Sequence, residues 1–286
     1  MLSSDQVNQY RRQGYCVAHG FLGSAQVAEL LADAQTICAT ATLANHDSTR
    51  MEMEPNQGMD GQKVRRLYEP CTHYPRFRAL SDSAEVLNSV EQLLGPNLMF
   101  HYSKLNMKPP AIGSVVEWHQ DLAYYPLTNR DSLAVLFYFD DADTTNGCLQ
   151  VIPGQHLGGA MDHTLEGFFQ GRITEPVDVC RAVPLAGKAG SVIFMNGMTP
   201  HASAPNTSSR PRRTLILSYR AADAFPIYIG DMTLSSEAHV RHVHGEQVRT
   251  ARFSMSTFPI PRYPKTTKSL YELQELSHKE QGARAS

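Results

Sequence analysis

The sequence lacks any run of about 18 apolar residues, the length that a membrane-spanning helix needs. Its first residues also lack the basic segment and apolar stretch of a secretory signal peptide, so neither a membrane span nor secretion is expected. Cysteine is scarce: the chain has five, odd in number, scattered and without a Cys-x-x-Cys pair. This argues against structural zinc and a disulfide framework, and it favours a cytoplasmic protein with buried free thiols.

A strong charge of either sign is absent as well. The formal net charge is −2, whereas a nucleic-acid-binding protein would normally be basic, so no nucleic-acid partner is expected. Hydrophobic residues form 42% of the 286, enough for a sizeable core, and no repeat or linker divides the chain. We therefore expect a single domain over 1–286. Its oligomeric state stays open, and a monomer is compatible with the composition.

Short apolar segments broken by Gly, Pro and Asn turns predict a mainly β fold, a sandwich or a barrel, with helices added near the start of the chain. The expected strands are 15–18, 98–108, 132–139, 148–152, 190–195 and 214–219. The expected helices are 4–13, which ends at Gly14, then 24–40, capped by Ser24, and 85–94. These elements suggest a helical part over about 1–97, a β core over about 98–222 and an extension over about 223–286.

Two long segments, 44–62 and 156–182, carry no firm helix or strand pattern. We expect them to be loops that cover the mouth of a site, because long functional loops often do so. Beyond Arg220 the pattern weakens, and a short final helix with a frayed end is expected after Leu270.

The tripeptide His119-Gln120-Asp121 is the clearest chemical signal. On an extended strand, residues two apart point to the same side, so one imidazole and one carboxylate can reach the same ion. His201 lies 82 residues later, at the end of an apolar strand, and would complete a triad of two histidines and one carboxylate. Such a triad holds Fe(II) and leaves neighbouring positions open for a co-substrate and dioxygen. A surface His-x-Asp pair and a hydrogen-bonded core histidine are the alternatives.

A basic run, Arg210-Pro211-Arg212-Arg213, follows His201. An arginine there would offer a planar, permanently charged donor pair for a co-substrate carboxylate. The alternative is an arginine at a solvated strand edge.

Three blocks taken together resemble the phytanoyl-CoA dioxygenase (PhyH) family of Fe(II)- and 2-oxoglutarate-dependent oxygenases. They are 119–126, the Asn146-Gly147-Cys148-Leu149 turn with Pro153-Gly154-Gln155-His156, and 201–206 running into the arginines. The resemblance covers about residues 5 to 220, and it implies a double-stranded β-helix core. It also implies a dioxygenase that hydroxylates or otherwise oxidises an unactivated C–H of a small-molecule substrate, with 2-oxoglutarate and dioxygen consumed and succinate and CO2 released.

The same resemblance suggests roles for further residues. In the family an arginine eleven residues after the distal histidine binds 2-oxoglutarate, which selects Arg212 over its two neighbours. It also suggests Ser203 as a hydroxyl partner for the same carboxylate, and Lys63 near the other end of 2-oxoglutarate. Related halogenases replace the carboxylate ligand with a small residue, so Asp121 favours hydroxylation over halogenation.

Two other functions stay open at this point. A zinc hydrolase would use the triad and an open metal position but would give Arg212 no task. A non-catalytic binding protein could keep the scaffold, although an intact triad with an intact arginine argues against it. The cluster His239-x-x-His242-x-His244 invites a second metal site, but no acid or cysteine accompanies it and Arg241 would repel a cation. A solvated surface cluster is the favoured interpretation.

Overall fold

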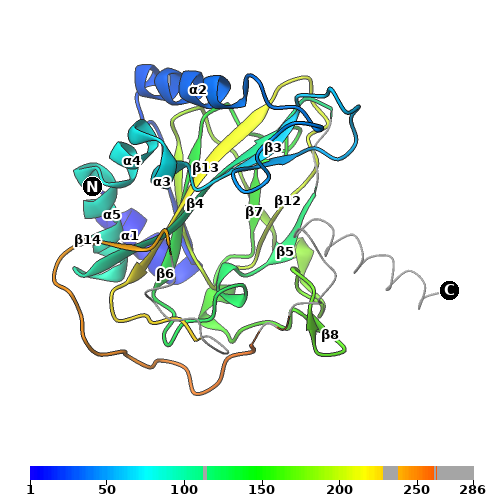
Figure 1. Ribbon diagram of the computed structural model, residues 1–286. Helices are drawn as coiled ribbons and strands as arrows, with labels where there is room; N and C mark the ends of the chain where they lie inside the picture. The colour runs from blue at the N-terminus through cyan, green and yellow to red at the C-terminus, as the bar shows by residue number, and fades with distance from the viewer. Residues whose placement is uncertain (112–114, 228–237, 261, 263–286) are drawn as a thin grey trace.

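The computed structural model describes residues 1–111, 115–227, 238–260 and 262. Its larger sheet has the strand order β1-β11-β6-β13-β4-β3-β2, with β14 also paired to β4 (Figure 1). These strands are β1 (Tyr15–Ala18), β2 (Met51–Met53), β3 (Val64–Tyr68), β4 (Leu98–Lys108), β6 (Ser132–Tyr138), β11 (Val192–Asn196), β13 (Arg212–Ala221) and β14 (Arg241–His244). The smaller sheet has the order β10-β7-β12-β5, with β5 (Val116–His119), β7 (Leu149–Val151), β10 (Val183–Leu185) and β12 (His201–Ser203).

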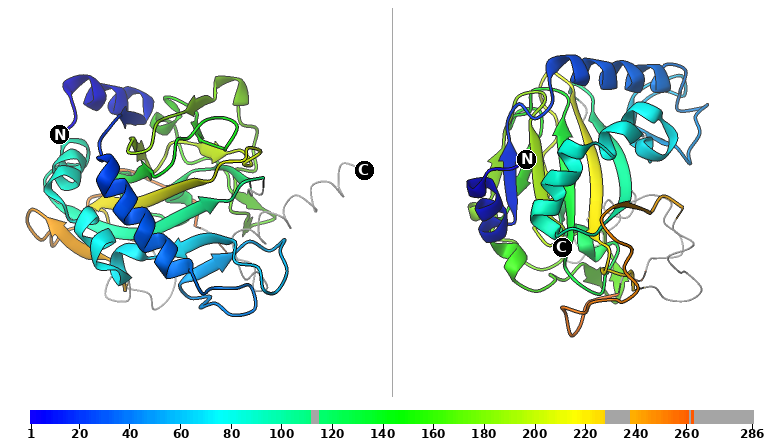
Figure 2. Two further views of the ribbon diagram at one scale, coloured as in Figure 1. Left: turned by 90° about the horizontal axis from the view of Figure 1, so that it is seen from above. Right: turned by 90° about the vertical axis from the view of Figure 1, so that its left-hand side faces the viewer.

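Five α-helices accompany the sheets in the described residues: α1 (Ser4–Gln13), α2 (Ser24–Cys38), α3 (Pro70–His73), α4 (Pro75–Ser81) and α5 (Ala84–Leu94). Three short 3₁₀ helices lie further along the chain: η1 (Asp121–Ala123), η2 (Gln155–Leu157) and η3 (Val179–Arg181). The views in Figure 2 show the α-helices gathered against one side of the larger sheet. This two-sheet architecture confirms the predicted mainly β, double-stranded β-helix fold with N-terminal helices.

The strand β6 has an apolar sequence because both of its faces are buried. Val135 and Phe137 belong to the core cluster that includes helix residues such as Leu30 and Phe77. Leu136 and its even-numbered neighbours belong instead to the cluster that includes β7 and β10. Side chains alternate between the two faces of a strand, so β6 is buried between the helical layer and the smaller sheet. The larger sheet is therefore the middle layer of the molecule.

Helix boundaries follow the predictions with small differences. Ser3 and Gln6 form a capping box at the start of α1, and Gly14 ends that helix with φ at 82°, a left-handed conformation that favours glycine. The second helix begins at Ser24, but its N-cap residue is Gly23, so the predicted capping by Ser24 is wrong. It also ends at Cys38, before the expected Thr40. The short helices α3 and α4 were not predicted.

The two long loops contain more regular structure than their sequences indicate. Segment 44–62 includes β2, which pairs with β3. Segment 156–182 includes η2, η3 and a hairpin of β8 (Thr164–Leu165) and β9 (Phe168–Phe169). Elements this short leave little periodicity in a sequence, which is why the pattern missed them.

Beyond Arg220 the structure adds β14, which pairs with β4 through Arg241 and His242. His239 contacts the Thr72 hydroxyl, and His244 forms an ion pair with Glu91 at 3.2 Å. The three histidines are thus half-buried parts of a strand and its approach, and the described residues bring no metal-ligating group together there. The expected final helix lies outside the described residues. Within the described part of the chain, no helix has the length and apolarity to cross a membrane.

Candidate metal centre

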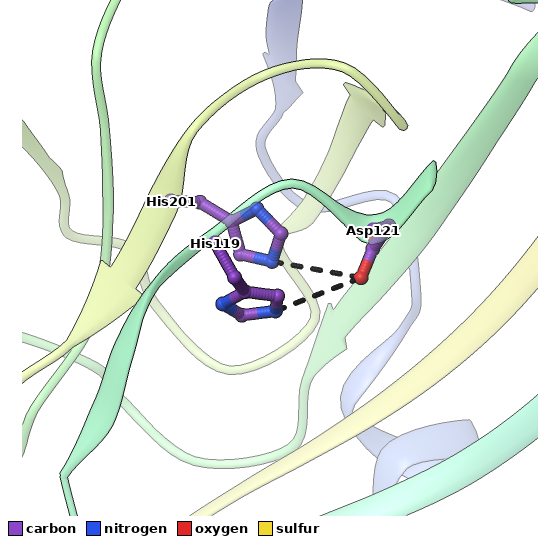
Figure 3. A group of neighbouring side chains, drawn as sticks. All are labelled: His119, Asp121 and His201. Atoms are coloured by element: carbon purple, nitrogen blue, oxygen red, sulfur yellow. Dashed lines mark ion pairs between the residues drawn. The ribbon is translucent and has the colours of Figure 1, made fainter. Parts of the chain in front are cut away.

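His119, Asp121 and His201 come together between the strands β5 and β12, and all three are buried. His119 and His201 are direct partners across the antiparallel pair. Their Nε2 atoms lie 3.7 Å and 3.8 Å from the same oxygen, Oδ1 of Asp121 (Figure 3). Hydrogen bonds of this kind are about 2.7–3.2 Å long, so the three ligand atoms surround a gap and do not bond directly. Among the described residues this is the only such cluster of possible metal ligands.

Backbone carbonyls fix the orientation of both imidazoles. Nδ1 of His119 lies 2.7 Å from the Glu117 carbonyl, and Nδ1 of His201 lies 3.0 Å from the Thr199 carbonyl. A carbonyl only accepts, so each Nδ1 carries the proton and each Nε2 keeps its lone pair. Both lone pairs point toward Asp121 (Figure 3). Ligating histidines in proteins are usually held in this way.

The Asp121 carboxylate lies just beyond the strand, where the sequence had placed it on an extended segment. Strand β5 ends at His119, Gln120 stays extended with φ −112° and ψ 129°, and Asp121 begins the 3₁₀ helix η1. The extended Gln120 still gives the two-residue alternation, so the carboxylate meets the His119 ring. The expectation that His119 and Asp121 point to the same side is correct, but Asp121 lies in a 3₁₀ helix and not on the strand.

Electrostatics favour the protonation states that bind a cation. Burial would raise the pKa of Asp121, but His201, His119 and Lys104 outweigh burial, so this pKa lies well below its usual value. Burial, together with His119, lowers the pKa of His201 to about 3 against the opposing effect of Asp121. At neutral pH the site therefore offers an ionised carboxylate and an uncharged His201.

Arg212 lies at the start of β13 with 5% of its surface exposed. Its guanidinium donates to the Thr214 hydroxyl at 2.8 Å and to the Ser203 hydroxyl at 3.4 Å. Its Nε is buried with no partner among the described residues, and burial lowers its pKa. A buried guanidinium without a carboxylate against it is ready to receive an anion. The structure thus brings together Arg212 and Ser203, the two residues that the family resemblance suggested for one carboxylate.

The neighbouring arginines are engaged elsewhere. Arg213 forms a bidentate pair with Asp140, at 2.8 Å and 2.6 Å, and Arg210 pairs with Asp143 at 2.6 Å on the surface. Strand alternation turns Arg213 away from Arg212, and Arg210 precedes β13, so only Arg212 of the three is turned into the space between the sheets.

Lys63 is exposed, and the structure does not bring it to the other predicted site residues. Its backbone N–H and carbonyl bond to the Gln57 side chain at the turn before β3. The buried lysine beside Arg212 is instead Lys108, whose ammonium donates to the carbonyls of Ser203, at 3.2 Å, and Ala204. The exposed Lys63 lies just before β3, so its place near the co-substrate gains no support from the observed contacts.

Sequence reasoning missed several groups around the centre. Lys104 and Lys108 lie on alternate positions of β4, a signal that was present in the strand pattern but was not used. Tyr124 lies edge-on to His119, with ring centroids 5.5 Å apart, and its hydroxyl donates to the Gly171 carbonyl at 2.6 Å. His163 accepts a hydrogen bond from the Gln120 backbone. Nothing in the local sequence signals this last contact.

A narrow pocket opens beside Arg212, between β3, β4, β13 and β5. It is lined by Glu54, Arg65, Arg66, Asn106, Met107, Lys108, Val116 and Arg212. Burial, with Arg212 and Arg65 next in effect, lowers the pKa of Lys108 to about 6. The pocket wall is thus rich in cationic side chains.

Curated relatives share most of the length of this chain. A probable alpha-ketoglutarate-dependent hypophosphite dioxygenase of Stutzerimonas stutzeri is 32% identical over 231 residues, which are 78% of this chain and 80% of that protein. An ectoine dioxygenase of Bordetella bronchiseptica is 26% identical over 241 residues, 78% of this chain and 76% of that protein.

Solved structures support the fold. The structure of EctD from S. alaskensis with bound Fe superposes with a TM-score of 0.69 at 22% identity, covering 86% of this chain and 88% of that one. The SnoN epimerase in complex with Fe3+, alpha ketoglutarate and nogalamycin RO gives a TM-score of 0.66 at 21% identity, covering 90% and 96%. Residues 10–214 match the phytanoyl-CoA dioxygenase (PhyH) family. With the fold, the buried triad and this match in agreement, the chain belongs to the phytanoyl-CoA dioxygenase family.

Proposed function

We propose that this protein is an Fe(II)- and 2-oxoglutarate-dependent dioxygenase in which His119, Asp121 and His201 hold the iron. The observation that carries the proposal is the convergence of two Nε2 lone pairs on one ionised carboxylate in a buried site. Two imidazoles and one carboxylate are the ligands that non-haem Fe(II) oxygenases use, and they leave positions open for co-substrates.

Arg212 would hold the far carboxylate of 2-oxoglutarate, and Ser203 would help to bind it. The guanidinium is buried, has an Nε without a partner among the described residues and contacts the Ser203 hydroxyl. When bound, iron with 2-oxoglutarate and dioxygen supplies the oxidising power for C–H hydroxylation, with succinate and CO2 as the co-products. The protein's residues orient the co-substrate and exclude water. Lys63 stays a weaker proposal for 2-oxoglutarate, since its side chain is exposed.

The substrate belongs to the small molecules. Several relatives carry names that refer to the small compounds hypophosphite, ectoine, methylphosphonate and L-proline, and two others are named for phytanoyl-CoA. We further infer a cytoplasmic enzyme without a nucleic-acid partner, and a monomer is compatible with the sequence. The five free cysteines and the near-neutral charge support this inference.

The test is stoichiometric succinate formation. Purified protein with added Fe(II), 2-oxoglutarate, dioxygen and a library of small molecules should release succinate above a slow background for the true substrate. Omission of Fe(II) or exclusion of dioxygen should stop this release. A zinc hydrolase would release no succinate, and its activity would not need 2-oxoglutarate. A non-catalytic protein would bind ligands without turnover.

A further inference from the structure

Lys104 lies on β4 beside the metal centre. Side chains alternate along this strand, and the neighbouring Ser103 points to the helical side, where it bonds to Glu69. Lys104 points the other way, toward the site: Asp121 raises its pKa and it lowers the pKa values of Asp121 and His201 in turn. The ammonium thus lies within electrostatic reach of two of the three metal ligands.

No carboxylate of the described chain neutralises this ammonium at contact distance. Lys104 is half-buried, its Nζ lies 5.4 Å from the centroid of the Tyr102 ring, and no described residue forms a hydrogen bond or ion pair with it. Burial is the largest influence on its pKa and lowers it, which reflects the cost of holding a charge away from water. A partly buried cation without a partner anion is costly unless a ligand supplies one.

The neighbouring cations already have partners. Arg66 donates to the Asn106 side chain at 2.9 Å and pairs with Glu52 at 3.4 Å, which also lies 3.8 Å from Arg65. Lys108 donates to two backbone carbonyls, and Arg212 is assigned to the far carboxylate of 2-oxoglutarate. Among these cations, Lys104 is therefore the one to which neither the protein nor the proposed co-substrate brings an anion.

The overall charge points the same way. The neighbouring pocket is lined by four cationic side chains and one carboxylate: Arg65, Arg66, Lys108 and Arg212 against Glu54. Asp121 and Glu69 raise the pKa of Lys104 from nearby, but neither forms an ion pair or hydrogen bond with it. The natural complement of this excess of cationic side chains is an anion.

We propose that Lys104 binds an anionic group of the substrate, a carboxylate or phosphonate oxyanion, and so holds the carbon that is to be oxidised beside the metal centre. This rests on the proposed function and names its substrate class. Lys104 is a binding and specificity residue in this scheme, with no role in proton transfer.

The test measures binding by calorimetry without dioxygen, in protein loaded with Fe(II) and 2-oxoglutarate. The probes are methylphosphonate against its neutral dimethyl ester, and isobutyrate against isobutyramide. Wild type should bind at least one anion tenfold more tightly than its neutral counterpart. Lys104→Met and Lys104→Gln should abolish that preference, whereas Lys104→Arg should retain most of it. The anion that wild type prefers distinguishes a phosphonate-type group from a carboxylate.

Two controls separate the possible failures. Lys188→Met removes an exposed lysine that pairs with Asp141, and it should leave the anion preference intact. Binding of 2-oxoglutarate, followed by the absorbance of its iron complex, should change less than threefold in Lys104→Met. An equal loss of 2-oxoglutarate binding would assign Lys104 to the co-substrate and overturn the proposal. Anion binding that is unchanged in Lys104→Met would overturn it as well. So would a wild type that shows no preference for either anion. A wild type that does not bind Fe(II) and 2-oxoglutarate together would instead overturn the proposed function.

Discussion

The backbone N–H of Gln120 donates to Nε2 of His163 over 3.0 Å, which links the metal-binding segment to a loop 43 residues further along the chain. The link is reinforced by the Gln120 side chain, which accepts from the Met161 N–H and donates to the Met198 carbonyl, both at 2.8 Å. The residue between two proposed ligands thus holds the covering loop on one side and the approach to His201 on the other.

We predict that His163→Ala weakens metal binding as well as stability. The substitution leaves the buried Gln120 N–H without an acceptor, which costs about 1–3 kcal/mol, and it removes the ring stacked on Phe169. The free energy of unfolding from urea denaturation and the Fe(II) affinity of the folded protein should both fall. His19→Ala is the matched control, because His19 is exposed and far from Gln120 in the hydrogen-bond network. Unchanged Fe(II) affinity in His163→Ala would mean that the link has no effect on the centre.

The stability of the metal-free protein should fall between pH 7 and pH 5 because of His163. Burial lowers the pKa of this imidazole to about 4, with a smaller opposing effect of the Met161 carbonyl. The unfolded chain binds a proton near the ordinary value of about 6.5, so below that pH the unfolded state takes up more protons and stability decreases until about pH 4. The contribution is on the order of 2 kcal/mol between pH 7 and pH 5.

The comparison that isolates this effect uses His163→Gln, whose amide oxygen can accept from Gln120 but does not titrate. Urea denaturation at both pH values should give a smaller loss of stability for this variant than for wild type. Equal losses would show that His163 does not carry the dependence.

His119→Ala and His201→Ala should each abolish iron-dependent turnover and leave the fold largely intact. The core of the two sheets is built from apolar side chains that do not need the metal. Circular dichroism should stay close to that of wild type, and Fe(II) binding should be lost. Recovery of more than about a tenth of the wild-type activity would refute the ligand assignment. Asp121→Ala should lose hydroxylation as well.

Arg212→Ala should raise the apparent KM for 2-oxoglutarate at least tenfold. The loss of a buried, charge-assisted pair costs about 2–5 kcal/mol. Arg210→Ala removes an exposed pair with Asp143 and should be mild. Arg213→Ala should lower stability through its loss of the Asp140 pair, with little change in KM. A larger change in KM for Arg213→Ala than for Arg212→Ala would show that the wrong arginine has been assigned.

Residues 44–62 and 156–182 should exchange backbone hydrogens fastest in the apo protein and become protected when substrate and 2-oxoglutarate bind together. A site that generates an oxidant must exclude water, and closing loops commonly do this. The anchored part near 161–174 should already be slower in the apo form, since Met161, Gln170 and Thr174 carry backbone hydrogen bonds. Equal protection of both loops with and without ligands would indicate a preformed pocket.

The sequence by itself determined the three longer helices α1, α2 and α5, the long strands and the ligand triad. Apolar alternation and turn residues are local properties, so β4 and β6 could be predicted almost to the residue. The His-x-Asp spacing correctly predicted that the two side chains meet, although Asp121 lies in η1 and not on the strand. The choice of Arg212 over its neighbours came from the family resemblance, and its burial agrees with it.

Only the tertiary structure decided which polar groups surround the triad. The position of Lys104 beside Asp121, the contact of Lys108 with Ser203 and the link from Gln120 to His163 all join segments more than 15 residues apart. Such contacts depend on strand register and on the face that each strand turns inward, and a shift of one residue reverses that face. Lys63, which the family resemblance suggested for the co-substrate, lies in the turn before β3 with its side chain exposed, and only the fold shows this.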